Sequence, residues 1–116
     1  MSLGKIGEEL ARKYLESKGY ELVKENYRFE RAEMDLIMKN EASKTLVFIE
    51  VKTRKTKAFG EPQEAVDEYK QLQLIKSAEG FMMNYPEYED YEKRFDIIAI
   101  FIEGDKEIIN HLENAF

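Results

Sequence analysis

The chain has 116 residues, 43% hydrophobic and 36% charged, so we expect one folded domain over residues 1–116 with a core of ordinary size. It has no cysteine and one histidine, which excludes disulfides, thiolate metal sites and hydrolytic sites built from several imidazoles. No apolar run approaches the ~20 residues needed to cross a membrane. Charges recur from Lys5 onward and leave no signal-peptide core, so we expect a cytoplasmic protein.

Helical and extended patterns alternate along the chain. Seven segments are expected: a helix over 3–18, strands over 20–28, 33–38 and 45–52, a helix over 63–84, and strands over 94–102 and 107–112. Gly19 is suited to end the first helix, and Pro62 to begin the second. The order α-β-β-β-α-β-β predicts an α/β domain in which a mixed sheet of about five strands lies between two helices.

The strand over 45–52 carries charges in a run that is otherwise apolar. Side chains alternate along a strand, so one face holds Leu46, Phe48, Glu50 and Lys52, and the other holds Val47, Ile49 and Val51. Both faces begin apolar, which is typical of a strand covered on both sides. Burying Glu50 and Lys52 there is costly unless something pairs with them. Asp35 interrupts the preceding strand in the same way, so the three side chains are expected to converge.

Two carboxylates and a lysine are the groups that metal-dependent phosphodiester hydrolysis requires. Mg²⁺ or Mn²⁺ prefers oxygen ligands, which Asp35 and Glu50 supply. A lysine beside the metal, such as Lys52, can orient or deprotonate the attacking water and stabilise the developing negative charge. The spacing alone is a weak signal, because these residue types are common. The alternative is that Glu50 and Lys52 only pair with each other at the sheet edge.

The net charge of −6 is distributed unevenly. Residues 24–57 carry nine Lys/Arg and six Asp/Glu, whereas the remainder carries nine and eighteen. Four basic residues lie within six positions at the end of the hairpin: Lys52, Arg54, Lys55 and Lys57. Their clustering favours contact with phosphates over an ordinary solvated loop.

The run Glu33-Met-Asp35-Leu-Ile, then 47–54 with Glu50-Val-Lys52-Thr-Arg54, then Phe59-Gly60-Glu-Pro62, resembles the YraN family, a bacterial group of predicted endonucleases. Further matching segments extend over nearly the whole chain: 4–8, 14–20, 26–28, 64–66 with Lys70, 94–96 and 111–116. The resemblance implies a restriction-endonuclease-like fold, similar to archaeal Holliday junction resolvases. One departure is Ala32, where the family usually has glycine, and this departure bears on substrate fit.

The resemblance also implies roles for particular residues. Asp35 and Glu50 are expected as metal ligands, Lys52 as the catalytic lysine, and Glu8 as a further catalytic acid from the first helix. Glu33 is expected either as another metal ligand or as a solvated edge charge. The residues expected to contact nucleic acid are Arg28, Arg54, Lys55 and Lys57. Lys70 lies on the second predicted helix and could face the site, but a surface lysine is the favoured expectation, and His111 is expected to be structural.

These expectations favour a Mg²⁺-dependent or Mn²⁺-dependent endonuclease that cuts DNA, in particular branched or damaged DNA. A homodimer is expected, because a four-way junction needs two symmetric cuts. The alternative is a module that keeps the nuclease fold but only binds nucleic acid or assembles with another protein. The acidic balance outside residues 24–57 and the alanine at position 32 favour this alternative.

Overall fold

The computed structural model describes residues 2–55 and 66–116. Its elements are α1 (Leu3–Glu16), β1 (Glu21–Phe29), β2 (Ala32–Asn40), β3 (Thr45–Arg54), α2 (Glu68–Asn84), the short 3₁₀ helix η2 (Pro86–Tyr88), β4 (Glu92–Glu103) and β5 (Lys106–Leu112). This order confirms the predicted succession α-β-β-β-α-β-β. Lys57, Pro62 and Gln63 lie outside the described residues.

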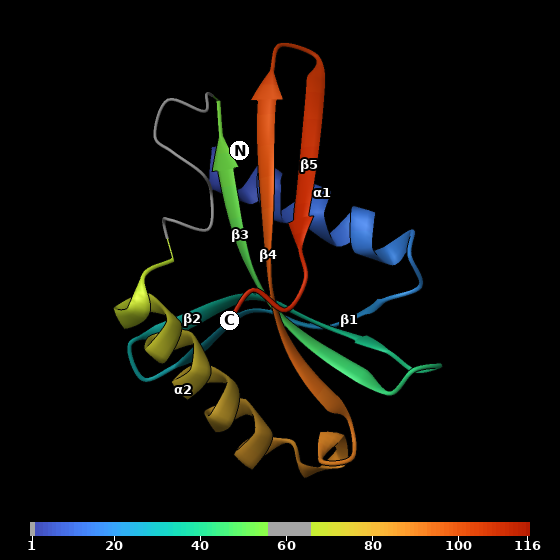
Figure 1. The fold of residues 1–116 in the computed structure, drawn as a ribbon, viewed down its shortest axis with the longest axis vertical. Coiled ribbons are helices and arrows are strands. Elements are labelled where there is room, and N and C mark those ends of the chain that lie inside the picture. Colours follow the sequence, from blue (N-terminus) through green and yellow to red (C-terminus); the bar gives the residue numbers. More distant parts are fainter. Residues whose placement is uncertain (1, 56–65) are drawn as a thin grey trace.

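The five strands form one mixed sheet in the order β1-β2-β3-β4-β5. β3 and β4 run parallel, and every other neighbouring pair is antiparallel. Figure 1 shows the sheet strongly twisted, with the β1–β2 hairpin running across the view and the upper parts of β4 and β5 running along it. Neither described helix is both long and apolar enough to cross a membrane.

The two helices cover opposite faces of the sheet and create two separate cores. On one face, Ala11 and Leu15 of α1 pack with Val47 and Ile49 of β3. On the other face, Leu74 and Phe81 of α2 pack among a set that includes Ile37, Leu46, Phe48 and Ile97. The alternation predicted for β3 is therefore confirmed, and the face that carries Phe48 also carries Glu50.

The second helix begins at Glu68. The prediction of a helix from Gln63 is therefore wrong for residues 66 and 67, the part of that stretch that the structure describes. Val66 and Asp67 are not helical. The carboxylate of Asp67 accepts a hydrogen bond of 2.9 Å from the backbone amide of Lys70, which is the geometry of a helix N-cap. The cap places Lys70 in the first turn of α2, and that position decides where its ammonium group can reach.

α1 lies close against β3 at Gly7. A Cβ atom at this position would lie 1.7 Å from Thr53 Oγ1 and 2.9 Å from Thr53 Cβ. Rotating the hydroxyl group would not relieve the contact, because Thr53 Cβ itself is too close. Gly4, one turn earlier in the same helix, has no neighbour within 4 Å of such a Cβ atom.

Gly7→Ala is therefore expected to lower the free energy of unfolding by about 1–3 kcal/mol, the usual cost of overpacking. Gly4→Ala is the matched control and should leave stability unchanged or slightly raised, because alanine favours the helix. Urea unfolding of both variants measures the difference. Equal stability of the two variants would show that α1 and β3 are not packed this tightly.

Candidate active site

The site is built where β2 separates from β3. Their antiparallel pairing runs from Asn40 and Thr45 to Leu36 and Ile49, and ends there. The next residue of β2 is Asp35, whose Oδ2 accepts a hydrogen bond of 2.8 Å from the backbone amide of Val51. The Asp35 side chain thus satisfies an amide that the separated β2 backbone no longer reaches, and its carboxylate is fixed beside β3.

Asp35 and Glu50 form a carboxylate pair in which Glu50 is buried and Asp35 is half-buried. The Glu50 side chain is only 5% exposed. Burial raises the pKa of Asp35 to about 8, helped by its hydrogen bond with Glu50 and the Glu50 charge, while the Val51 amide and Lys52 act in the opposite direction. Two adjacent carboxylates that cannot both ionise freely hold a proton between them, or hold a cation in its place. The predicted convergence of Asp35 and Glu50 is therefore present in the structure.

Two lysines approach the Glu50 carboxylate from different elements. Lys52 Nζ of β3 lies 4.0 Å from Glu50 Oε1, and Lys70 Nζ of α2 lies 3.6 Å from Oε2. Lys70 is 40% exposed, so it lies at the surface as expected, and its ammonium group also faces the site, which was the alternative left open. The sequence signal that bears on its position is Asp67, because an N-cap there places Lys70 in the first turn of α2.

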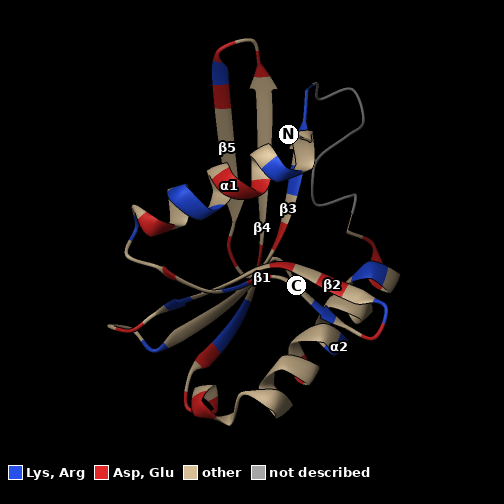
Figure 2. Cartoon of the chain, turned by 180° about the vertical axis from the view of Figure 1, so that it is seen from behind, with Lys and Arg blue, Asp and Glu red and all other residues tan. Residues whose placement is uncertain are grey.

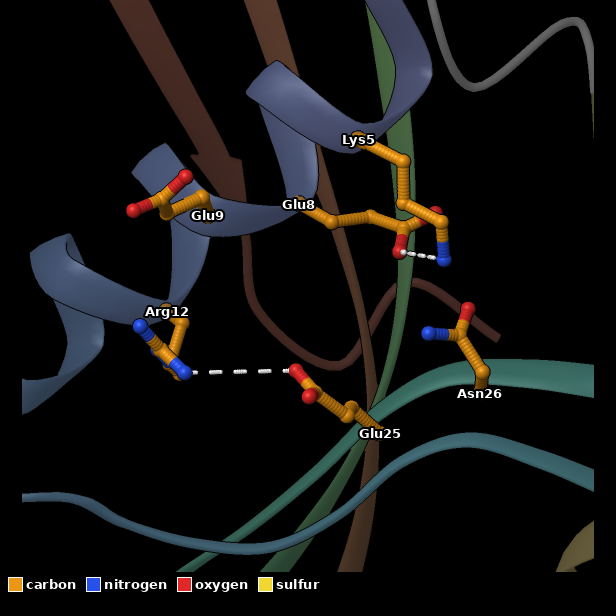
Figure 3. Close-up of a pocket in the computed structure, with 6 residues that line it drawn as sticks. All are labelled: Lys5, Glu8, Glu9, Arg12, Glu25 and Asn26. Carbon is orange, nitrogen blue, oxygen red and sulfur yellow. Dashed lines mark hydrogen bonds and ion pairs between the residues drawn. The ribbon is translucent and has the colours of Figure 1, made fainter. Parts of the chain in front are cut away.

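Glu8 comes to the same region from the opposite helix. Desolvation raises the pKa of Glu8 and the charge of Asp35 raises it further, whereas Lys5 opposes both effects. Lys5 Nζ lies 3.5 Å from Glu8 Oε1. Figure 3 shows both side chains extending from α1 toward β1. Glu8 is therefore close enough to sense the charge of Asp35, although it lies on the helix that covers the other face.

The remaining residues that the sequence predicted for the site lie at its edge. Glu33 Oε2 and Arg28 form an exposed ion pair of 3.5 Å, so each carries a partner of opposite charge. Arg54 donates a hydrogen bond of 3.1 Å to the backbone carbonyl of Thr53, and Lys55 is exposed. Within the described ranges, neither Arg54 nor Lys55 has an ion-pair partner. Figure 2 shows basic residues at this end of β3, and their contact with nucleic acid stays a prediction.

The alanine at position 32 introduces no backbone strain. Ala32 is buried at the start of β2 and pairs with Phe29 across a two-residue turn. The left-handed position of this turn is Glu30, with φ of 56°. The turn itself therefore does not require glycine at position 32.

The donor atoms around Glu50 fit a hard divalent cation. Asp35 and Glu50 provide carboxylate oxygens, and Oε2 of Glu50 is buried without a hydrogen-bond partner among the described residues. Among residues 2–55 and 66–116, no group of three or more acidic, histidine or cysteine side chains is placed to hold a metal ion. Mg²⁺ commonly uses one or two carboxylates and completes its shell with water and substrate phosphate, so two carboxylates meet this requirement.

A second polar cluster is centred on Asp96 of β4 and has a different character. Asp96 is fully buried and accepts two hydrogen bonds of 2.9 Å from Arg94 and one of 3.1 Å from the Asn114 amide. His111 Nε2 lies 2.6 Å from its Oδ2, and Tyr14 lies 3.2 Å from His111 Nδ1. Every side chain here has a partner, which is typical of a structural network and agrees with the role expected for His111.

Comparison with known proteins identifies the family. The uncharacterised protein family UPF0102 matches residues 7–100. The chain belongs to the UPF0102 family. This family is YraN-like, so the resemblance noted in the sequence is confirmed.

UPF0102 relatives match almost from end to end. The UPF0102 protein of Caldicellulosiruptor bescii is 42% identical over 116 residues, covering 98% of this chain and 96% of the relative. The UPF0102 protein of Christiangramia forsetii is 45% identical over 115 residues, covering 98% of this chain and 92% of the relative. Among solved structures, Pyrococcus furiosus SfsA in complex with Ca²⁺ is similar with a TM-score of 0.36 and 17% identity, over 96% of this chain and 62% of the SfsA chain.

Proposed function

We propose that this UPF0102 protein is a cytoplasmic Mg²⁺-dependent or Mn²⁺-dependent endonuclease that hydrolyses phosphodiester bonds in DNA. The observation that supports it is the pair formed by half-buried Asp35 and buried Glu50, approached by two lysines from separate elements. Burying one acid beside a second, half-buried acid is unfavourable for folding. Such an arrangement is typical of sites where a cation or a reacting group offsets the repulsion.

Asp35 and Glu50 would hold the cation, which when bound polarises the scissile phosphate and supports the leaving oxygen. Lys52, directed toward Glu50 from the same strand, would orient the attacking water and move its proton. Lys70 is the more exposed of the two lysines, at 40% against 19%. It would therefore face the phosphate and stabilise the additional negative charge of the transition state.

The basic end of β3 would bind the DNA backbone. Arg54 and Lys55 lie two and three residues after Lys52, so phosphates bound there would lie near the carboxylate pair. Lys57 and Arg28 are proposed as further contacts. We propose branched or damaged DNA as the substrate and a homodimer as the active form, since two symmetric cuts need two sites.

Titration of Mn²⁺ by calorimetry tests the proposal, together with cleavage of a four-way junction and a linear duplex. The wild type should bind Mn²⁺ and cleave DNA only when metal is present. Glu50→Gln should lose most of the heat of binding and reduce cleavage by about 10²–10⁴-fold, since it removes a metal ligand. Glu103→Gln, an exposed acid at the end of β4, is the matched control and should behave as the wild type.

Absence of Mn²⁺ binding by the wild type, with and without DNA, would overturn the catalytic proposal. It would support a module that binds nucleic acid without cutting it. In that case DNA affinity should fall steeply with salt and should depend on Arg54 and Lys55.

A further inference from the structure

The outer side of α2 is unusually apolar for a helix at the surface. Four large apolar side chains are exposed in the described part of the chain, and three of them lie on this helix: Tyr69, Leu72 and Met83, each between 63% and 80% exposed. Figure 1 shows α2 on the outside of the molecule, against one face of the sheet. The inner side of the helix already fills a core through Leu74 and Phe81. A helix that is apolar on both sides is typical of one buried between two bodies, so we expect a partner on its outer side.

A groove of about 550 Å³ lies beside these side chains, where α2 meets β3 and β4. Its apolar lining includes Ile75, Met82 and Met83 from α2 and Phe95 from β4. A second hollow shares Met82 and Met83 with the groove and extends it to Pro86. The apolar surface is therefore continuous along the helix, which is typical of an interaction site and not of scattered surface residues.

The exposed residues of α2 follow a regular spacing. Steps of three, four, three and four residues connect the members of one stripe: Tyr69, Leu72, Lys76, Glu79 and Met83. This spacing aligns side chains along one side of a helix for packing against a second helix. The two charged members are neighbours in the stripe and are opposite in sign. The stripe can therefore pack against a copy of itself with each charge facing its opposite.

We propose that this stripe is the interface of a homodimer in which α2 packs antiparallel against α2 of a second copy. A two-fold axis makes every contact reciprocal, so that two different positions face each other twice. With the axis midway between Lys76 and Glu79, each Lys76 faces the partner's Glu79. Each Leu72 then faces the partner's Met83, and each Tyr69 reaches the partner's Pro86.

The charges favour a second copy over an unrelated partner. Glu79 has no ion-pair partner among the described residues, and the antiparallel arrangement supplies one. Lys76 Nζ lies 2.7 Å from Glu30, with both side chains more than half exposed. An exposed ion pair contributes at most about 1 kcal/mol, so Lys76 can also contact the partner's Glu79. A strongly acidic or strongly basic partner would instead place a like charge against one of the two positions.

The inference deepens the proposed function, because it assigns an interface to the homodimer proposed there, and it does not depend on the metal site. Lys70, beside Glu50, lies on the same helix as the stripe. In the antiparallel pair the two copies of Lys70 lie at opposite ends, about 20 Å apart along the helices at 1.5 Å per residue. The dimer would therefore hold two candidate sites at a fixed separation, as two cuts in one DNA substrate require.

Sedimentation velocity at protein concentrations on the order of 1–100 μM tests the inference, since a contact of this size is expected to be of moderate affinity. The wild type should dimerise within this range. Leu72→Lys should remain monomeric, because it places a charge in the apolar stripe. Ile108→Lys is the matched control and should dimerise as the wild type, since Ile108 is the other exposed large apolar residue of the described part and lies on β5. A monomeric wild type, or a dimer that Leu72→Lys leaves intact, would overturn the inference.

Charge reversal tests the antiparallel register. Lys76→Glu and Glu79→Lys should each weaken dimerisation by at least about 10-fold, because like charges then face each other twice. An equimolar mixture of the two variants should regain wild-type affinity, since one copy then carries two acids at these positions and the other carries two bases. A mixture that associates no better than the separate variants would contradict the register and overturn the inference.

Calorimetric titration of Mn²⁺ into the same proteins separates the interface from the metal site. Leu72→Lys should bind Mn²⁺ with wild-type affinity, because Leu72 lies on the outer side of α2, away from the core. A wild type that binds Mn²⁺ but stays monomeric would overturn the interface and leave the metal site intact. A wild type that dimerises through the stripe but binds no Mn²⁺ would overturn the catalytic proposal and leave the interface intact.

Discussion

Asp96→Ala is expected to lower the free energy of unfolding by about 3–5 kcal/mol, the usual cost of removing one partner of a buried charge pair. Asp96 is fully buried and holds Arg94 and His111 through its carboxylate, while Arg94 also donates a hydrogen bond of 2.9 Å to Tyr20. Without the carboxylate, the Arg94 guanidinium would remain partly buried and lose both of its hydrogen bonds to that residue.

The same network should make the protein sensitive to acid. Burial raises the pKa of Asp96, but hydrogen bonds from His111, Arg94 and the Asn114 amide outweigh it, and the net pKa lies below the usual value. The ionised carboxylate therefore contributes stability above the ordinary pKa of an aspartate. That contribution is lost as the pH falls through the lowered value.

Urea unfolding at pH 7 and at decreasing pH measures both effects. The wild type should lose stability toward acid more steeply than Asp96→Ala, whose remaining slope comes from other carboxylates. Asp105→Ala, in the exposed turn between β4 and β5, is the control and should stay within about 0.5 kcal/mol of the wild type. A loss below about 1 kcal/mol in Asp96→Ala would contradict the role of the network.

Asp35→Asn should have opposite effects on activity and on stability. Asparagine keeps an oxygen for the Val51 amide but removes the charge beside Glu50. Metal-dependent cleavage should fall by about 10²–10⁴-fold, as expected for a lost metal ligand. The free energy of unfolding in metal-free buffer should rise by about 1–3 kcal/mol at pH 8, since a poorly compensated buried charge is removed.

The stability gained in Asp35→Asn depends on pH, because the pKa of Asp35 is raised in the folded protein. The pKa of Asp35 is raised in the folded protein, to about 8, by desolvation and by Glu50. The folded state therefore binds more protons than the unfolded chain above the ordinary aspartate pKa, and wild-type stability falls as the pH rises toward 8. Asp35→Asn lacks this decline.

Unfolding curves at pH 5 and pH 8.5, recorded with a chelator, compare the two proteins. The stabilising effect of Asp35→Asn should be small at pH 5 and larger at pH 8.5, and Mn²⁺ should stabilise only the wild type. Asp105→Asn serves as the control for adding an amide at the surface. A destabilised Asp35→Asn at pH 8.5 would show that the carboxylate pair is structural, and would count against a site built to hold a cation.

The sequence predicted those features that depend on periodicity. The alternation of β3 identified both buried faces, and the charges at Glu50 and Lys52 stood out because they broke an apolar run. Asp35 was found for the same reason. Local patterns of this kind follow from side-chain geometry within one strand, so they need no knowledge of neighbouring elements.

Features that depend on contacts between elements were not accessible in this way. Whether Lys70 reaches Glu50 depends on the residue at which α2 begins and on how the helix is rotated against the sheet. The left-handed backbone of Asn26 inside β1 depends on how β1 is paired with β2. Neither follows from periodicity, because single residues at such positions carry no repeating signal.

The hydrogen bond from Val51 to Asp35 provides a spectroscopic probe of the site. The Val51 amide belongs to the most central strand, yet its acceptor is a carboxylate whose proton or cation can change. Its proton and nitrogen chemical shifts therefore report the state of the carboxylate pair, whereas the Ile49 amide, two residues earlier, lies in regular pairing and provides an internal reference. One backbone resonance can thus follow occupancy of the site in the unmodified protein.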